Sequence, residues 1–124
     1  MVLLVDDNAI QAATRQTILR RAGYSVQAVL SPLRALELFQ KKEFVQEIGV
    51  VISDHIMPGM NGAEFVRELR RIRPDIPVIV ISGLEEAEDE YDDLGVRFLL
   101  KPLPPDQLIA NLQSLLLIQQ QGAA

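Results

Sequence analysis

Polar or charged residues directly follow short apolar runs at four places along the chain. They are Asp6 with Asp7, then Asp54, Ser82 and Lys101. The apolar runs have the length of strands, and continuous apolar strands are typical of parallel sheets that helices cover on both faces. Because the carboxyl ends of parallel strands meet at one edge of a sheet, we expect three carboxylates, one hydroxyl and one ammonium to converge there.

Such a group of side chains suits phosphoryl transfer. Three carboxylates in one cleft repel each other and lose hydration, and a divalent cation removes that cost. Mg²⁺ takes oxygen ligands and leaves positions free for a phosphoryl oxygen. Lys101 would supply positive charge, Ser82 a hydroxyl donor, and Asp54 the nucleophile. Taken singly, each residue has a simpler interpretation, as a helix cap (Asp7), a turn residue (Asp54, Ser82) or a surface charge (Lys101).

The elements that must position these groups alternate along the chain. Turn residues such as Met57-Pro58-Gly59 separate the strands from helices, and Asn61 with Glu64 resembles a capping box. This alternation implies right-handed crossovers and a doubly wound parallel α/β sheet with helices on both faces. The expected strands span Val2–Val5, Ser25–Leu30, Val50–Ser53, Pro77–Ile81 and Arg97–Leu100, and the last helix spans Pro105–Gln119.

Apolar residues at helical spacing predict the buried face of each helix. The first helix ends at Gly23, the second begins at Ser31-Pro32, and the third ends at Arg73-Pro74. The predicted buried residues are Ile10, Ala13, Ile18, Leu19 and Ala22 in the first, Leu33, Leu36 and Phe39 in the second, Phe65, Leu69 and Ile72 in the third, and Leu108, Ile109, Leu112, Leu115 and Leu116 in the last.

The composition indicates one ordinary domain without thiol or zinc chemistry. The chain has 124 residues, 48% of them hydrophobic, with no cysteine and one histidine. Its start, Met1–Asp7, lacks the basic and long apolar regions of a signal peptide, and no apolar run approaches the length of a membrane span. We therefore expect a cytoplasmic protein that makes no membrane contact.

The formal net charge of -5 is concentrated between Glu85 and Asp93, where seven acids lie without a base. The remaining chain carries ten acids and twelve bases. A concentrated negative field argues against direct nucleic-acid binding. The basic cluster is predicted to be a solvated helix face, and its members are Arg67, Arg70, Arg71 and Arg73. The acidic segment is predicted to be a short helix with one narrow buried face, made of Leu84, Ala87, Tyr91 and Leu94. The alternative is a disordered loop.

In these motifs the chain resembles the receiver domains of two-component response regulators. The matching features are Asp6-Asp7, Asp54 within Asp-x-x-Met-Pro-Gly-Met-x-Gly, Ser82 after a β-rich strand, and Phe98-x-x-Lys101-Pro102. The resemblance covers essentially the whole chain. It implies a flavodoxin-like (βα)5 fold, with a five-stranded parallel sheet in the order 2-1-3-4-5. We expect a single receiver domain over residues 1–124, with residues 120–124 as a frayed tail.

The resemblance implies a role for each residue of the site. Asp54 would accept a phosphoryl group from a phosphohistidine on a sensor histidine kinase or a phosphotransfer protein. Mg²⁺, or Mn²⁺, would be bound by Asp7, Asp54 and the backbone carbonyl of Ile56, with Asp6 supporting the site from behind. Lys101 would contact the phosphoryl group, and its bond to Pro102 would be cis.

The resemblance also implies how the signal would leave the site. Ser82 would move to the phosphoryl group and Phe98 would change rotamer. Both changes would alter the face made by the acidic helix, the last strand and the last helix, to which an unidentified effector protein or domain binds. The segment between Ser82 and Lys101 is shorter than in the family, so this face is expected to differ. Its acids favour a basic partner, and we expect a monomer before phosphorylation.

Ile56 and Leu84 lie two positions beyond Asp54 and Ser82. Neither can orient a water, so they are interpreted as tuning residues that slow autodephosphorylation. His55 is expected to point away from the site as a solvated turn residue, and Tyr91 to be a core residue of its helix.

Two other functions compete with a phosphorylated receiver that is not an enzyme in its own right. One is an interaction domain of the same fold that never turns over phosphate, and the other is a small hydrolase acting through an aspartyl-phosphate. The intact acceptor site favours the receiver over the first. The sequence predicts neither a substrate cap nor a dedicated general acid for the second. Whether the receiver is free-standing or part of a longer regulator or hybrid kinase stays open.

Overall fold

A computed structural model describes the backbone of residues 1–123 and the side chains of residues 1–118. The chain alternates strands and helices throughout, as the sequence predicted. The elements are β1 (Val2–Val5), α1 (Ala9–Arg21), β2 (Val26–Val29), α2 (Pro32–Phe39), α3 (Lys42–Val45), β3 (Val50–Asp54), α4 (Gly62–Ile72), β4 (Val78–Ser82), the 3-10 helix η1 (Glu85–Tyr91), β5 (Arg97–Leu100) and α5 (Pro105–Ala123).

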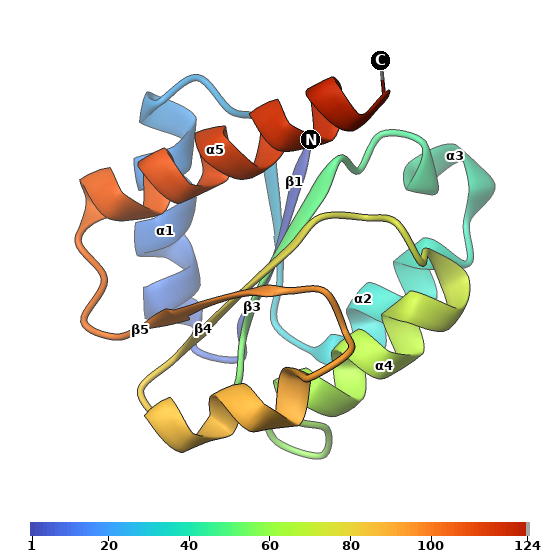
Figure 1. Cartoon of the computed structure of the whole chain (residues 1–124), viewed down its shortest axis with the longest axis horizontal. Coiled ribbons are helices and arrows are strands. Elements are labelled where there is room, and N and C mark those ends of the chain that lie inside the picture. Colours follow the sequence, from blue (N-terminus) through green and yellow to red (C-terminus); the bar gives the residue numbers. More distant parts are fainter. Residues whose placement is uncertain (124) are drawn as a thin grey trace.

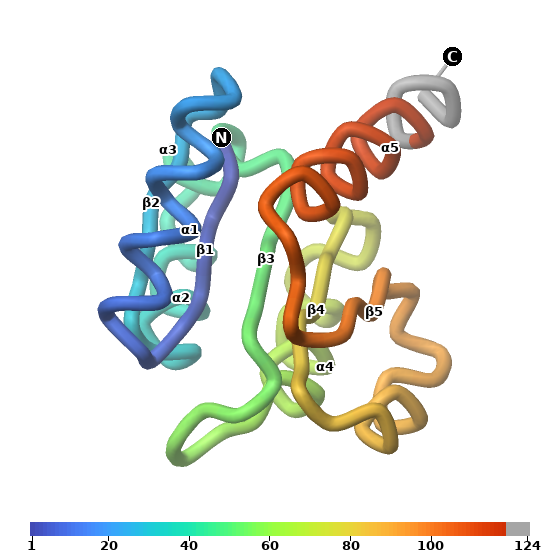
Figure 2. The backbone as a smooth tube through the Cα atoms, turned by 90° about the vertical axis from the view of Figure 1, so that its left-hand side faces the viewer, coloured from blue at the N-terminus to red at the C-terminus, as the bar shows by residue number. Residues whose placement is uncertain are grey.

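The five strands form one parallel sheet in the order β2-β1-β3-β4-β5. Helices α1 and α5 cover one face of the sheet, and α2 and α4 cover the other (Figures 1 and 2). The predicted flavodoxin-like fold and its strand order are therefore confirmed. Because β3 lies between β1 and β4, the polar residues that end these strands come together at one edge.

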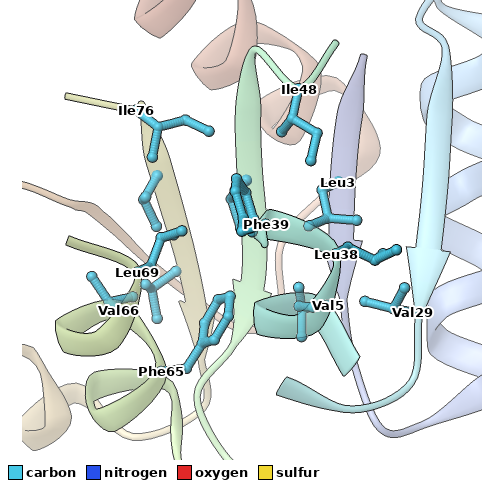
Figure 3. Close-up of a cluster of buried hydrophobic side chains, with 14 of the residues drawn as sticks. Leu3, Val5, Val29, Leu38, Phe39, Ile48, Phe65, Val66, Leu69 and Ile76 are labelled. Carbon is cyan, nitrogen blue, oxygen red and sulfur yellow. The ribbon is translucent and has the colours of Figure 1, made fainter. Parts of the chain in front are cut away.

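Each face of the sheet has its own hydrophobic core, since successive strand residues point to opposite faces. Leu3 and Val5 pack with Phe39, Phe65 and other residues of α2 and α4 (Figure 3). On the opposite face, the buried residues include Val2, Leu4, Leu19, Leu108 and Leu112. These cores leave the carboxyl edge of the sheet for polar groups.

The buried face of helix α1 was predicted only in part. Leu19 is buried and Ile18 is half-buried, but Ile10 is 81% exposed, and Ala13 and Ala22 are exposed as well. Ala12 and Arg15 are buried in their place. The apolar stripe was loose, and the charge on Asp6 allows a guanidinium to occupy the inward face.

In α2, Ala35, Leu38 and Phe39 are buried, and the predicted core residue Leu33 is 59% exposed. Ser31 caps this helix as expected, by accepting a hydrogen bond from the Arg34 N–H. In α5, Leu108 and Leu112 are fully buried, while Ile109, Leu115 and Leu116 are half-buried. Apolar residues three or four apart fit more than one rotation of a helix, and packing against the sheet selects one.

The acidic segment is ordered as η1, with Ala87 and Tyr91 buried. The predicted narrow buried face is confirmed for Ala87 and Tyr91, whereas Leu84 is exposed and Leu94 is half-buried, and the helix is 3-10 rather than α. Helix α5 continues past the expected end at Gln119 to Ala123. The side chains of the expected frayed tail lie outside the described residues. Over residues 1–123, no helix is long and apolar enough to cross a membrane.

The basic cluster is solvated only in part: Arg67 and Arg71 are exposed, as predicted, whereas Arg70 and Arg73 are half-buried. The Arg70 guanidinium donates to the carbonyls of Leu94, Ile76 and Gly95, at 2.7, 2.6 and 3.1 Å. Burial lowers the pKa of Arg70, and Asp75 opposes that shift. Other arginines of the cluster bind backbone as well: Arg67 contacts the Glu90 carbonyl and Arg73 that of Val45. These arginines tie α4 to neighbouring loops, which polarity alone did not reveal.

Candidate functional site

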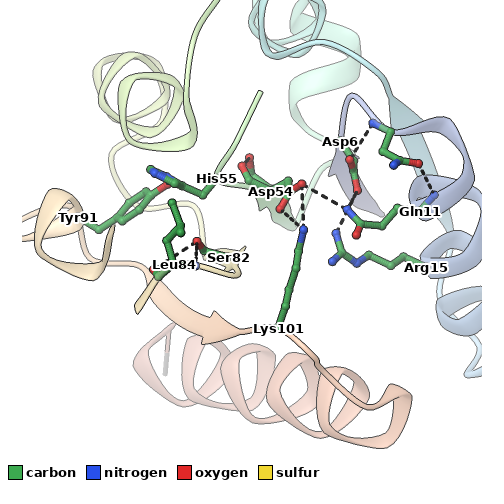
Figure 4. Close-up of polar contacts among 11 residues, drawn as sticks. Asp6, Gln11, Arg15, Asp54, His55, Ser82, Leu84, Tyr91 and Lys101 are labelled. Carbon is green, nitrogen blue, oxygen red and sulfur yellow. Dashed lines mark hydrogen bonds and ion pairs between the residues drawn. The ribbon is translucent and has the colours of Figure 1, made fainter. Parts of the chain in front are cut away.

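The carboxyl edge of the sheet holds the predicted cluster of polar side chains. Asp54 ends β3, Ser82 ends β4, and Asp6 and Lys101 directly follow β1 and β5. Carboxylate oxygens of Asp6, Asp7 and Asp54 lie within 4.8 Å of one another. Figure 4 shows Asp54 between Asp6 and Lys101.

The Asp54 carboxylate forms an ion pair with Lys101. Lys101 Nζ lies 3.0 Å from Asp54 Oδ1 and 3.3 Å from Oδ2. The Lys101–Pro102 peptide bond is cis, and the Lys101 N–H donates to the Ser82 carbonyl at 2.8 Å. The lysine is therefore connected to two strand ends, and its ammonium faces the carboxylate.

Asp6 is fully buried and accepts three hydrogen bonds. The Asn8 N–H donates to Oδ1 at 2.9 Å, while Gln11 Nε2 and an Arg15 guanidinium nitrogen approach Oδ2 at 2.6 and 3.1 Å. Gln11 Nε2 also lies 3.3 Å from Asp54 Oδ2, so one amide bridges two carboxylates (Figure 4).

Sequence analysis missed Gln11 and Arg15. Burial lowers the pKa of Arg15, while the charges of Asp6 and Asp54 raise it again. The signal that could have found them is the spacing of Gln11 and Arg15, which are four residues apart in the helix that follows Asp6-Asp7 and therefore lie on one side of it.

The Ser82 hydroxyl forms its hydrogen bonds within the turn that follows β4. Its hydroxyl accepts the Leu84 N–H at 2.9 Å and donates to the Leu84 carbonyl at 3.4 Å. The side chains of Leu84 and Ile56 are 40% and 61% exposed. The structure thus brings Asp6, Asp7, Asp54 and Lys101 together, and holds Ser82 beside them in a local hydrogen bond.

His55 points away from Asp54, toward η1, but it is not solvated as predicted. Its side chain is buried, with Nδ1 2.6 Å from the Tyr91 hydroxyl and Nε2 3.4 Å from a Glu90 carboxylate oxygen. Burial and the Glu90 charge raise the pKa of Tyr91. Tyr91 is a core residue, as predicted, and its ring centroid lies 5.7 Å from that of Phe98.

The oxygen ligands of the acidic cluster fit a hard divalent cation. Asp6 and Asp54 are buried whereas Asp7 is exposed, so the cluster opens to solvent at Asp7. Mg²⁺ binding through one or two carboxylates with retained waters is compatible with this arrangement.

Comparison with known families identifies the chain. The model of the response regulator receiver domain matches residues 2–113. The chain belongs to this family. Among solved structures, the receiver domain resembles the chemotaxis protein CheY4 of Vibrio cholerae, with a TM-score of 0.80 and 31% identity over 92% of this chain and 96% of that one. A receiver domain protein from Clostridium thermocellum, 24% identical over 97% of this chain and 96% of that one, shares the fold with a TM-score of 0.88.

The curated relatives are longer proteins. The chain is 36% identical to the sensor kinase CckA of Brucella abortus over 93% of its own length, which is 12% of that protein. It is 37% identical to the C4-dicarboxylate transport transcriptional regulatory protein DctD of Pseudomonas aeruginosa over 96% of its own length, which is 26% of the relative. Receiver domains like this one therefore occur in both kinases and transcriptional regulators.

Proposed function

We propose that this receiver domain accepts a phosphoryl group on Asp54. The observation that carries the proposal is the position of the Asp54 carboxylate, between the Lys101 ammonium and the acidic residues that follow β1. The donor is a phosphohistidine on a sensor histidine kinase or phosphotransfer protein. An Asp54 carboxylate oxygen forms the new P–O bond as the P–N bond to the donor imidazole breaks, and that imidazole nitrogen takes up a proton.

Each neighbour of Asp54 has a role in that step. Lys101 stabilises charge on the phosphoryl oxygens, and Asp6 supports the site through its hydrogen bonds. Asp7, Asp54 and the Ile56 carbonyl would hold Mg²⁺, which would neutralise negative charge between the acceptor and the incoming group. The domain promotes only its own phosphorylation and dephosphorylation.

Ser82 and Phe98 carry the signal onward. For its hydroxyl to reach a phosphoryl oxygen, Ser82 must leave its hydrogen bonds to Leu84, which frees the turn that precedes η1. Phe98 packs against Tyr91 of η1, so a change in either element alters the face formed by η1, β5 and α5. The partner at that face is an effector protein or domain, with basic residues opposite the acids of η1. The receiver domain itself contacts neither nucleic acid nor membrane, and it is a monomer before phosphorylation.

The test is the intact mass of the protein after incubation with acetyl phosphate, with and without Mg²⁺. We expect a gain of one phosphoryl group in the wild type that requires Mg²⁺ and is absent in Asp54→Asn. Asp75→Asn, which changes an exposed aspartate elsewhere, is the matched control and should be phosphorylated like the wild type. A folded wild type that gains no mass from acetyl phosphate or from a phosphohistidine donor would favour an interaction domain that works without phosphate. Repeated turnover of a phosphate ester would favour the hydrolase instead.

A further inference from the structure

Arg15 is a buried cation beside the acidic cluster. It lies on α1, the helix that follows the acidic pair, and its guanidinium contacts Asp6 Oδ2 at 3.1 Å. Its side chain is 11% exposed and that of Asp6 is fully buried. We propose that Arg15 weakens the binding of a divalent cation at the acidic cluster by placing a permanent positive charge against Asp6. This inference rests on the metal site of the proposed function.

The charges of the cluster show why Arg15 matters. Asp6, Asp7 and Asp54 bring three negative charges, and Lys101 and Arg15 bring two positive charges within contact distance of Asp54 and Asp6. The group therefore carries a net charge of about -1 with Arg15 and about -2 without it, since an arginine does not lose its proton at neutral pH. A divalent cation is attracted by the net negative charge, so halving that charge weakens its binding.

The surroundings of Arg15 prevent solvent from cancelling this effect. Arg15 is 9% exposed, and buried charges are screened less than charges at the surface. The charges of both Asp6 and Asp54 act on it, so its field reaches the proposed ligands as well as its direct partner. Gln11, one turn earlier on α1, bridges the same two carboxylates without adding charge.

The effect of Arg15 can be measured by Mn²⁺ binding to the protein alone, from the electron paramagnetic resonance signal of free Mn²⁺. Arg15→Gln removes the charge but retains a donor for Asp6, and we expect it to bind Mn²⁺ roughly ten-fold more tightly. Arg15→Lys retains the charge and should stay within about two-fold of the wild type. Arg20→Gln makes the same change at an exposed position of the same helix and should also leave the affinity unchanged. Asp7→Asn identifies the part of the signal that comes from this site.

Three results would contradict the inference. Unchanged or weaker Mn²⁺ binding by folded Arg15→Gln would mean that Arg15 orders Asp6 instead of opposing the cation. If Arg15→Lys bound Mn²⁺ as tightly as Arg15→Gln, the charge of Arg15 would not be the cause of the weaker binding. Absence of Asp7-dependent binding in the wild type would overturn the metal site itself, and is thereby distinct from the first two. If circular dichroism shows that Arg15→Gln is unfolded, Mn²⁺ binding is measured with Arg15→Met instead, because its flexible apolar side chain also lacks the charge and packs well in a buried position.

Discussion

The two sides of Asp54 are built differently. On the α1 side, Gln11 and Arg15 form short polar contacts to carboxylates, two of them with buried Asp6. On the η1 side, the Ser82 hydroxyl bonds within its own turn. Residues of η1 contact the rest of the domain through Tyr91, which lies against His55 and Phe98, and through Glu90, which lies against His55 and Arg67.

This difference indicates that the two sides of Asp54 have different roles. A network of charged hydrogen bonds is costly to break, so the α1 side keeps the carboxylates in place. A serine hydroxyl bonded within its own turn is easier to rearrange, so the η1 side is suited to changing shape.

Removing the ammonium beside Asp54 should have the largest effect. We expect Lys101→Ala to slow phosphorylation by acetyl phosphate roughly a hundred-fold, because the charge that stabilises the transferred group is lost. Lys41→Ala changes an exposed lysine outside the site; it is the control and should keep the wild-type rate. The measurement is the rate of phosphoprotein formation by mass spectrometry. An unchanged rate in Lys101→Ala would remove Lys101 from the proposed chemistry.

The close approach of η1 to the β3 turn depends on Gly62. A Cβ at this position would collide with the Tyr91 hydroxyl and lie 2.9 Å from the Asp54 carbonyl. We therefore expect Gly62→Ala to destabilise the protein by about 1–3 kcal/mol in urea unfolding. Gly49→Ala meets nothing within 4 Å and should be close to neutral. Because both changes act on the Tyr91 hydroxyl, the double variant with Tyr91→Phe should lose less stability than the two single losses added together. Additive losses would show that the hydroxyl is not the obstacle.

Polar groups on the η1 side should shorten the life of the phosphorylated state. We expect Ile56→Asn combined with Leu84→Glu to accelerate dephosphorylation roughly ten-fold, because the new side chains can orient an attacking water. Leu33→Glu changes an exposed leucine on α2 and is the matched control. The decay of the phosphorylated mass in buffer with Mg²⁺, after acetyl phosphate has been removed, measures the rate. Unchanged decay in the double variant would contradict the interpretation of Ile56 and Leu84.

The smallest effect concerns the Tyr91 hydroxyl. Tyr91→Phe leaves buried His55 Nδ1 without its partner, so we expect a loss of about 1 kcal/mol at neutral pH. Burial raises the pKa of Tyr91 in the folded protein, so the unfolded chain ionises first as pH rises past about 10. The wild type should therefore lose stability above that pH more steeply than Tyr91→Phe. Parallel pH profiles of the two proteins would contradict this, and Tyr24→Phe, at the other tyrosine, serves as the control.

Local patterns in the sequence were enough to predict a doubly wound parallel α/β sheet with Asp6, Asp7, Asp54, Ser82 and Lys101 at strand ends, because apolar runs form strands, glycine and proline break them, and parallel strands end at one edge. The Asn61–Glu64 capping box was predicted for the same reason, because both of its hydrogen bonds lie within one turn of helix. The strand order came from the resemblance to receiver domains and not from a local rule.

The side chains that complete the site could not be predicted from local patterns. The sequence assigned no role to Arg15 and predicted a solvated His55, yet both are buried, because Asp6 pairs with Arg15 and Tyr91 with His55. The exposure of Ile10 has the same origin, because α1 is rotated so that Arg15 rather than Ile10 faces inward toward Asp6. A helical pattern gives the spacing of residues but not the rotation of the helix, and that rotation is set by contacts across the sheet that no local rule contains.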